Sequence, residues 1–216
     1  MSPAEDGLRR ALVEGGVALL PTDTVYGLAA WLDSLPGVAA LYELKGRPRE
    51  RPSQVLLYSR PLLDEALGYL EPPTRRAAAA LLPGPATCLV PDPQRRYVAA
   101  AGAEAGSVGL RAPRVDGPLA RLDLPLVATS ANLPGGPDPA AVADVPEALR
   151  EGCAAVVDAG RLAGTASAVV DLRAVAGGGP ARLLREGPDP AALARALAEA
   201  GCTLARGHDD PGEAPA

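Results

Sequence analysis

The chain has 216 residues, 48% of them hydrophobic, and this is enough apolar material for one sizeable core. Its 21 basic and 26 acidic residues give a net charge of −5, which argues against a protein that binds nucleic acid mainly through positive charge. No apolar run approaches the roughly 20 residues that span a bilayer, so we expect a cytoplasmic protein with no membrane association.

Helices are predicted where apolar residues recur at a spacing of three or four and a stop signal follows. The first such segment ends at Gly15–Gly16, and the second follows a possible Ser34 cap and closes at Gly46. In chain order, the predicted helices span 4–14, 36–44, 62–70, 74–82, 115–122, 140–150 and 191–200.

Strands are predicted where short apolar runs lie between turn signals. Pro21 should end the first strand, because proline lacks the N–H that would extend the ladder. In chain order, the predicted strands span 17–20, 54–58, 87–90, 107–111, 126–129, 155–157, 168–172 and 182–184. This mixture predicts an α/β protein with one folded domain over 1–205 and a disordered acidic tail over 206–216.

The composition also restricts the chemistry. Cys88, Cys153 and Cys202 are odd in number and far apart, which argues against a disulfide framework and against a zinc site. The only histidine, His208, lies in the polar C-terminal stretch, so a mechanism with histidine as base or metal ligand is nearly excluded. No metal site made of protein side chains is expected.

Two polar segments near the N-terminus could carry chemistry. Residues 21–28, Pro-Thr-Asp-Thr-Val-Tyr-Gly-Leu, place two hydroxyls and a carboxylate directly after a predicted strand, where ligands favour binding. The alternative is an ordinary turn in which Asp23 and Thr24 satisfy backbone groups. Residues 45–51 hold four cations and one anion, which suits a polyanion such as a triphosphate. The alternative there is a solvated loop beyond a helix C-terminus.

Further polar groups lie at the ends of later strands. Arg111 could bind a carboxylate, with Ser107 four residues before it, or it could pair with a structural acid. Ser130 and Asn132 offer hydroxyl and amide groups to a phosphate or a base, and they would serve equally as a turn and helix cap.

A third set of polar groups lies near the last strands. Residues 164–171 form a small-residue loop that could bring backbone donors to an anion. Arg185 adds a cation at a strand end, where Glu186 is its alternative partner. Five polar strand ends in one small chain exceed what turns require, so we expect a binding site among them.

The order of these motifs is more informative than any one of them. Between about Gly15 and Gly187 the chain carries Pro-Thr-Asp-Thr-Val-Tyr-Gly-Leu, Lys-Gly-Arg-Pro, Pro-Gly-Pro-Ala-Thr, Leu-Arg-Ala-Pro, Ser-Ala-Asn, Ser-Ala-Val-Val-Asp and Leu-Arg-Glu-Gly. In this order they closely resemble the single-domain form of the YrdC-like threonylcarbamoyl-adenylate synthase family. The resemblance implies a twisted mixed β-sheet with flanking helices and an open cleft.

The resemblance also implies an activity. The chain would be a nucleotidyltransferase that joins L-threonine, bicarbonate and ATP, with Mg²⁺ on the ATP, and releases pyrophosphate. A downstream tRNA-modifying transferase complex would use the product. The residues implied for threonine are Thr22, Arg111, Ser167 and the backbone of Ala128. Those implied for ATP are Lys45, Arg47, Ser107, Ser130, Asn132 and Arg185, with Arg49 as a weaker candidate; Lys45 and Arg47 are the implied catalytic residues.

The sequence departs from the family pattern at three places. Ala168 stands where the family has the second hydroxyl of a Ser-Thr pair. Asp138 puts a carboxylate where a serine is common, which is unfavourable beside phosphate unless only its backbone is used. The stretch 173–180 is longer and richer in glycine than usual, so we expect the loop before Arg185 to move.

Two other functions stay open. One is a double-stranded-RNA-binding module of the same fold that uses the cations of 45–51, and the net charge of −5 counts against it. The other is a carbamoyl-transfer relative with a different acceptor. ATP turnover that depends on threonine would favour the synthase over both.

Overall fold

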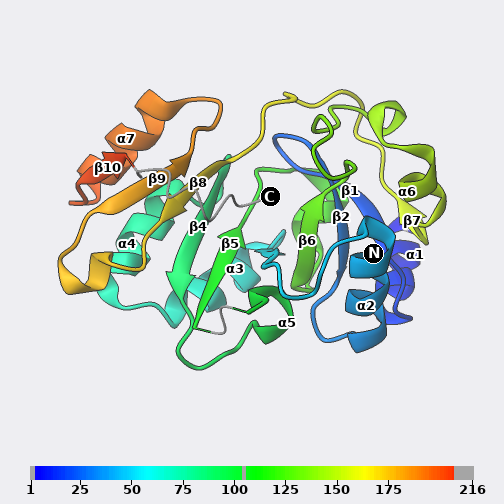
Figure 1. Cartoon of the computed structure of the whole chain (residues 1–216), viewed down its shortest axis with the longest axis horizontal. Helices are drawn as coiled ribbons and strands as arrows, with labels where there is room; N and C mark the ends of the chain where they lie inside the picture. Colours follow the sequence, from blue (N-terminus) through cyan, green and yellow to red (C-terminus); the bar gives the residue numbers. More distant parts are fainter. Residues whose placement is uncertain (1–2, 104–105, 207–216) are drawn as a thin grey trace.

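One mixed β-sheet forms the centre of the computed structural model, which describes residues 3–103 and 106–206 (Figure 1). The strands are β1 (Ala18–Pro21), β2 (Tyr26–Trp31), β3 (Gln54–Leu56), β4 (Ala86–Pro91), β5 (Ser107–Arg111), β6 (Leu126–Ser130), β7 (Ala155–Val156), β8 (Ala168–Asp171), β9 (Ala181–Arg185) and β10 (Leu204–Arg206). They lie in the order β10-β9-β8-β4-β5-β3-β6-β2-β1-β7. The pairs β1–β7, β3–β5, β4–β8 and β9–β10 are parallel, and the other neighbours are antiparallel. The predicted α/β fold with a mixed sheet is therefore confirmed.

Helices flank this sheet on both faces (Figure 1). They are α1 (Pro3–Val13), α2 (Leu35–Lys45), α3 (Arg60–Gly68), α4 (Pro72–Leu81), α5 (Val98–Ala101), α6 (Glu147–Glu151) and α7 (Pro190–Glu199), with 3-10 helices η1 (Gly117–Arg121), η2 (Val142–Asp144) and η3 (Val175–Gly177). Within the described part of the chain, no helix is long and apolar enough to cross a membrane.

The alternation of side chains along the strands gives the sheet two different faces. Val55, Cys88 and Leu110 point to one face, where they form the larger apolar cluster with residues of α2, α3 and α4. On the other face, Leu56 and Leu126 join a smaller cluster with α1 and η1, near the β1 end of the sheet. Among the described residues, the smaller cluster includes none from β4, β5 and β8.

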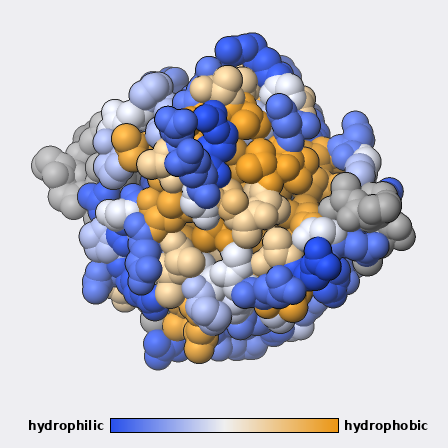
Figure 2. Space-filling model, turned by 90° about the vertical axis from the view of Figure 1, so that its right-hand side faces the viewer, coloured by the Kyte–Doolittle hydropathy of each residue, from blue (hydrophilic) through white to orange (hydrophobic). Residues whose placement is uncertain are grey.

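Apolar side chains also reach the surface at one end of the sheet. Figure 2 shows the side of the molecule that carries α1, α2 and α6, where hydrophobic residues gather. Val13, Leu35 and Val156 are among the exposed apolar side chains, and Leu35 is 76% exposed. The edge strand there, β7, is only two residues long, which limits pairing with another sheet edge.

The predicted elements differ from the structure in several places, one of which is the 3-10 helix η3, which was not predicted. Strand β2 was not predicted, because Gly27, Ala29 and Ala30 have low strand propensity; its ladders with β1 and β6 stabilise it. The short elements α5 and β10 were not predicted either. The predicted helix 140–150 is wrong: Pro146 divides it into η2 and α6, because a residue before proline disfavours the helical region. The predicted helix 115–122 is instead the 3-10 helix η1, which begins at Gly117 and Pro118.

The domain prediction stays a prediction. Arg206, the first residue of the expected tail, ends β10. Residues 207–216 lie outside the described part of the chain.

Candidate functional site

A cavity of about 470 Å³ opens on the face of the sheet that carries the smaller cluster. Most of the strand residues that line it alternate along their strands, as expected from the two-residue period of a strand. These residues are Gln54 and Leu56 of β3, Thr87 and Leu89 of β4, Ser107, Gly109 and Arg111 of β5, Ala128 and Ser130 of β6, and Val169 of β8. The volume is typical of a site for a small molecule or a cofactor.

The turn between β1 and β2 forms one wall of the cavity. The Thr22 hydroxyl donates to the carbonyl of Val25 at 2.7 Å and accepts from the backbone N–H groups of Thr24 and Val25, both at 3.1 Å. Thr22 and Thr24 are buried, and both line the cavity. The polar residues of this segment therefore organise a turn, which was the alternative interpretation, and they also face the cavity.

Arg111 is the last residue of β5 and the largest of the fully buried side chains, with 1% of its surface exposed. Its guanidinium forms an ion pair with Asp23, donates to the carbonyl of Gly84, and donates to Thr24 Oγ1 at 3.3 Å. The backbone N–H of Arg114 donates to the other carboxylate oxygen of Asp23 at 3.0 Å. Arg111 thus pairs with a structural acid and lines the cavity at the same time.

A chain of hydrogen bonds crosses the cavity from β3 to β9. Thr87 Oγ1 donates to Gln54 Oε1 at 2.9 Å and lies 3.1 Å from Ser167 Oγ. Since the Thr87 proton is used on Gln54, Ser167 is the donor in the second bond. Arg185 Nε donates to the carbonyl of Ser167 at 3.0 Å and holds it in place. Gln54 and Thr87 were not assigned to the site from the sequence. Thr87 ends the Pro-Gly-Pro-Ala-Thr motif, and strand alternation could have indicated Gln54.

Lys45 lies behind the cavity wall, at the end of β6. Its ammonium donates to the carbonyl of Ser130 at 2.9 Å, to Asn132 Oδ1 at 2.6 Å, and to the carbonyl of Asn132. Asn132 Oδ1 also accepts from Ser130 Oγ at 2.7 Å, so the amide is fixed with its Nδ2 toward the carbonyl of Gly136. Burial lowers the pKa of Lys45 to about 8; the charge of Arg47 contributes in the same direction, and Asp138 opposes it.

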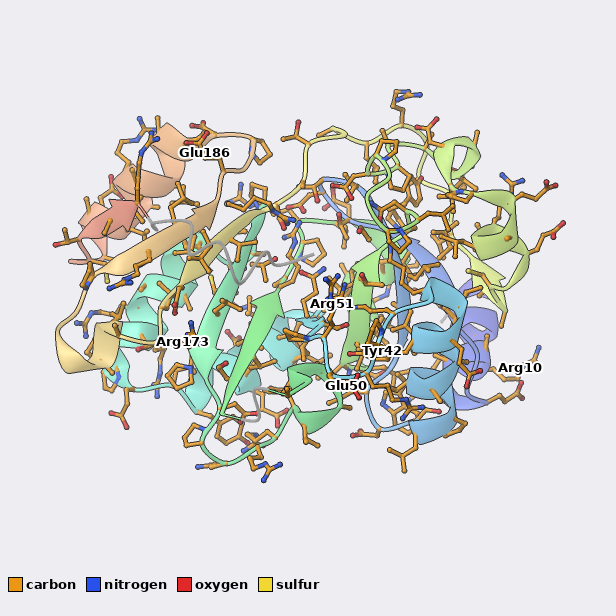
Figure 3. All side chains as sticks on the ribbon, in the orientation of Figure 1. Arg10, Tyr42, Glu50, Arg51, Arg173 and Glu186 are labelled. Atoms are coloured by element: carbon orange, nitrogen blue, oxygen red, sulfur yellow. The ribbon has the colours of Figure 1, made fainter. Side chains whose placement is uncertain are left out.

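The segment 46–53 between α2 and β3 brings further charges to the cavity. Arg47, Glu50 and Arg51 line it, while Arg49 is exposed and lies outside the lining. Figure 3 shows Arg51 near the centre of the molecule, between the two halves of the sheet. Arg47 Nη2 donates to the carbonyl of Pro52 at 2.6 Å, and its Nε is buried without a hydrogen-bond partner.

Most residues predicted for the site come together around this one space. Those that line it are Thr22, Arg47, Ser107, Arg111, Ala128, Ser130, Ser167 and Arg185. Lys45 and Asn132 stand directly behind Ser130. Among the residues described, no three His, Cys, Asp or Glu side chains gather into a group that could hold a metal ion.

Comparison with known proteins identifies the family of this chain. A model of the Sua5/YciO/YrdC family, described as telomere recombination, matches residues 10–187. The chain belongs to this family. It is 32% identical over 154 residues to the threonylcarbamoyl-AMP synthase of Bacillus subtilis, covering 69% of this chain and 44% of that protein. It is 33% identical over 182 residues to the putative threonylcarbamoyl-AMP synthase of Mycobacterium tuberculosis H37Rv, covering 82% and 81%.

Solved structures of the Sua5/YciO/YrdC family have the same fold. The Sua5 protein of P. abyssi in complex with L-threonine has a TM-score of 0.77 at 27% identity, over 93% of this chain and 59% of that chain. E. coli YciO has a TM-score of 0.68 at 19% identity, over 85% and 89%. The chain spans less than half of the Bacillus relative and little more than half of P. abyssi Sua5, which are longer proteins.

Proposed function

We propose that the chain is an L-threonylcarbamoyl-adenylate synthase, a nucleotidyltransferase that uses L-threonine, bicarbonate and ATP. One observation carries the proposal: a single cavity, in a family member, gathers fixed cations and hydroxyls from strands far apart in the sequence. The relatives named as threonylcarbamoyl-AMP synthases and the Sua5 complex with L-threonine support this substrate. The product would pass to a tRNA-modifying transferase complex.

Threonine would bind at the end of the cavity beside the β1–β2 turn. Arg111 offers fixed guanidinium donors there, and the ion pair with Asp23 holds them in one orientation. Thr22, Ser167 and the backbone of Ala128 line the same region. A fixed planar guanidinium attracts a bound carboxylate by its charge and also sets the orientation of that carboxylate.

ATP would bind at the opposite end, against the segment 46–53 and the end of β6. Arg47, Ser107 and Ser130 line this end, while Lys45 and Asn132 support Ser130 from behind. Arg185 would reach ATP from beside Ser167, where the two ligands would adjoin. Arg51 adds a cation on the lining; it belongs to the predicted cationic segment 45–51 but was not among the residues implied for ATP. Arg49 is not among the residues that line the cavity.

The arrangement suits a reaction between two anions. The threonine amine would react with bicarbonate to form a carbamate and water, and a carbamate oxygen would then attack the α-phosphorus of ATP and displace pyrophosphate. The carbamate and the phosphate are both anions and repel each other. Fixed cations lower this barrier when they neutralise both groups and hold them in line for the attack. Mg²⁺ on ATP would neutralise part of the triphosphate charge. No protein nucleophile is needed.

Pyrophosphate release tests the proposal directly. The purified chain is incubated with ATP and bicarbonate and with each amino acid in turn. We expect release of pyrophosphate with threonine and little release without an amino acid. Release that does not depend on the amino acid, or none with threonine, would contradict the proposed function.

Arg47 gives a residue-level test of the ATP end. Replacing Arg47 with Ala removes a cation from the lining, so we expect kcat/KM for ATP to fall by roughly 10- to 100-fold, a typical loss for one charged contact. Arg76→Ala is the matched control, because Arg76 is exposed on α4, on the other face of the sheet. Equal kinetics in both variants would place ATP elsewhere.

A further inference from the structure

The segment 157–167 crosses most of the width of the sheet, and we call it the strap. It joins β7, at one edge of the sheet, to β8, the third strand from the other edge. Figure 1 shows it running from the side of α6 and β7 over to β8. Every residue of the strap is described, most are exposed, and none lies in a helix or strand. Its last two residues, Ala166 and Ser167, line the cavity, so the path of the strap bears on the site.

The strap has little length to spare. Seven strand spacings separate β7 from β8, and at about 4.8 Å each they amount to about 33 Å across the sheet. The twelve steps from Val156 to Ala168 reach about 40 Å when fully extended. A nearly extended chain absorbs little displacement, so a shift at its middle is passed on toward Ser167.

One side chain holds the middle of the strap. The Tyr26 hydroxyl accepts from the N–H of Ala159 at 2.9 Å and donates to the carbonyl of Gly160 at 2.8 Å. Asp158 Oδ1 accepts from the N–H of Gly160 at 2.8 Å and lies 3.1 Å from the same hydroxyl. Tyr26 is the first residue of β2, and its side chain is fully buried. Its hydroxyl therefore pairs with a backbone N–H and a backbone carbonyl of the strap, as a neighbouring strand would.

Backbone hydrogen bonds continue this attachment toward the cavity. The N–H of Leu162 donates to the carbonyl of Ala140 at 2.7 Å, and the N–H of Gly164 donates to the carbonyl of Thr24 at 2.9 Å. Thr24 belongs to the β1–β2 turn at the threonine end and lines the cavity. Of these three attachments, the one made by Tyr26 uses a side chain, so a substitution removes it without changing the backbone.

The backbone of Tyr26 is attached at the other end of the cavity. Its carbonyl accepts from the N–H of Ala131 at 3.0 Å, and its N–H donates to the carbonyl of Pro139 at 2.9 Å. Ala131 lies between Ser130 and Asn132, which the proposed function places at the ATP end. These bonds do not involve the hydroxyl. Loss of the hydroxyl should therefore disturb the strap and leave the ATP end in place.

We propose that the Tyr26 hydroxyl is a positioning group for L-threonine: it anchors the strap and thereby sets where Ala166 and Ser167 stand on the cavity wall. The inference rests on the proposed function, because it needs threonine beside Ser167. Tyr26 is a positioning residue, since its hydroxyl acts through the strap. A tyrosine that served packing alone would need only its ring, which phenylalanine also supplies.

Equilibrium binding of L-threonine to Tyr26→Phe tests the inference. This substitution keeps the buried ring and removes the hydroxyl, and the exposed Ala159 and Gly160 can pair with water instead. We expect the dissociation constant of L-threonine, measured by calorimetry, to rise about 3- to 10-fold, the size of one net hydrogen bond. The dissociation constant of a non-hydrolysable ATP analogue should change by less than about twofold, because the ATP end keeps its contacts.

Tyr69→Phe is the matched control. Tyr69 is 48% exposed at the end of α3, its hydroxyl lies 3.4 Å from Glu65 Oε1, and it is outside the cavity lining. Both dissociation constants should stay unchanged in this variant. Asp158→Ala is a second variant, because it releases the N–H of Gly160 within the strap. If Tyr26→Phe does not fold, Asp158→Ala decides in its place, with the same expected change.

Two results would overturn the inference while leaving the proposed function intact. One is an unchanged affinity for L-threonine in the variant. The other is an equal or larger loss of affinity for the ATP analogue, which would show a general loosening of the structure. If the original chain does not bind L-threonine, the proposed function fails and the inference fails with it.

Discussion

Arg111 and Asp23 form an ion pair that connects two distant parts of the chain at the cavity wall. Their side chains are 1% and 14% exposed, so the two charges have little contact with water. Removing one partner of such a pair leaves the other charge buried and unpaired. The pair therefore contributes to both the stability of the wall and the orientation of the donors offered to threonine.

Replacing Arg111 with Ala should lower the free energy of unfolding by about 3–5 kcal/mol, because Asp23 then stays buried without its partner. Urea denaturation measures this loss. Arg114→Ala is the control: its exposed guanidinium donates to the carbonyl of Pro83, and its loss should cost less than about 1 kcal/mol. Similar losses in the two variants would show that the pair is not a buried one in solution.

Lys45 should make ATP binding depend on pH. Burial lowers the pKa of its ammonium to about 8, so the group is charged below pH 8 and becomes neutral above it. We expect the affinity for ATP to decrease as the pH rises from 7 to 9.5. In Lys45→Gln, which has no titrating group there, the affinity should be weaker and nearly constant. The dissociation constant of an ATP analogue across this range is the measurement, and identical profiles would contradict the role.

At the level of elements, the segment 46–53 depends on contacts with α5 and the turn after it. The N–H of Ser53 donates to the carbonyl of Ala100 at 2.8 Å, and the N–H of Ala103 donates to the carbonyl of Glu50 at 2.9 Å. Tyr42 on α2 donates to Ser53 Oγ at 3.0 Å. These contacts come from three regions of the sequence and hold Arg47 and Arg51 toward the cavity.

A substitution at Gly102 tests whether these contacts hold the segment 46–53 in place. Gly102 has a φ of +58°, and a Cβ there would lie 2.4 Å from the carbonyl oxygen of Glu50. Gly102→Ala should therefore push the segment away, and we expect kcat/KM for ATP to fall roughly 10- to 100-fold from misplacement of its cations. The control is Gly106→Ala, since a Cβ at that position has open space around it. Unchanged kinetics in Gly102→Ala would show that the segment can shift without loss.

Residue periodicity, caps and turn residues predicted most helices and strands. They failed where an element depends on pairing with segments distant in the sequence. The cap of α2 is an example of success: Ser34 Oγ accepts from the N–H of Gly37 at 3.2 Å, and Gly46 ends the helix with a φ of +60°. Strand β2 is the contrary case, because its register with β1 and β6, more than its own propensity, makes it a strand. A short strand is fixed by its neighbours, and these are not visible in a local window of sequence.

At the scale of the molecule, the cavity joins the two halves of the sheet, with β4, β5 and β8 on one side and β2 and β6 on the other. A ligand that contacts both halves stabilises the native state relative to the unfolded chain. The stabilisation is about 2.7 kcal/mol at a ligand concentration 100 times the dissociation constant. Ligand binding should therefore be measurable as a change in melting temperature.

We expect threonine and a magnesium–ATP analogue, each at such a concentration, to raise the melting temperature by about 5–10 °C for a chain of this size. Gly109→Leu is the control. Gly109 lines the cavity between Thr87 and Leu89, so a larger side chain fills the space that the ligands need. An equal rise in this variant would show that the ligands bind outside the cavity.

The sequence by itself determined the α/β class, most helices and strands, and the family, because these depend on residue periodicity, turn residues and ordered motifs. Most of the residues that it named for the site line the cavity or stand directly behind its wall. The tertiary structure decided that Arg111 pairs with Asp23, that Lys45 supports Asn132 from behind, that Arg49 lies outside the cavity lining, and that Gln54 and Thr87 join the site. These facts depend on which strands are neighbours and on which face each side chain emerges, and long-range pairing sets both.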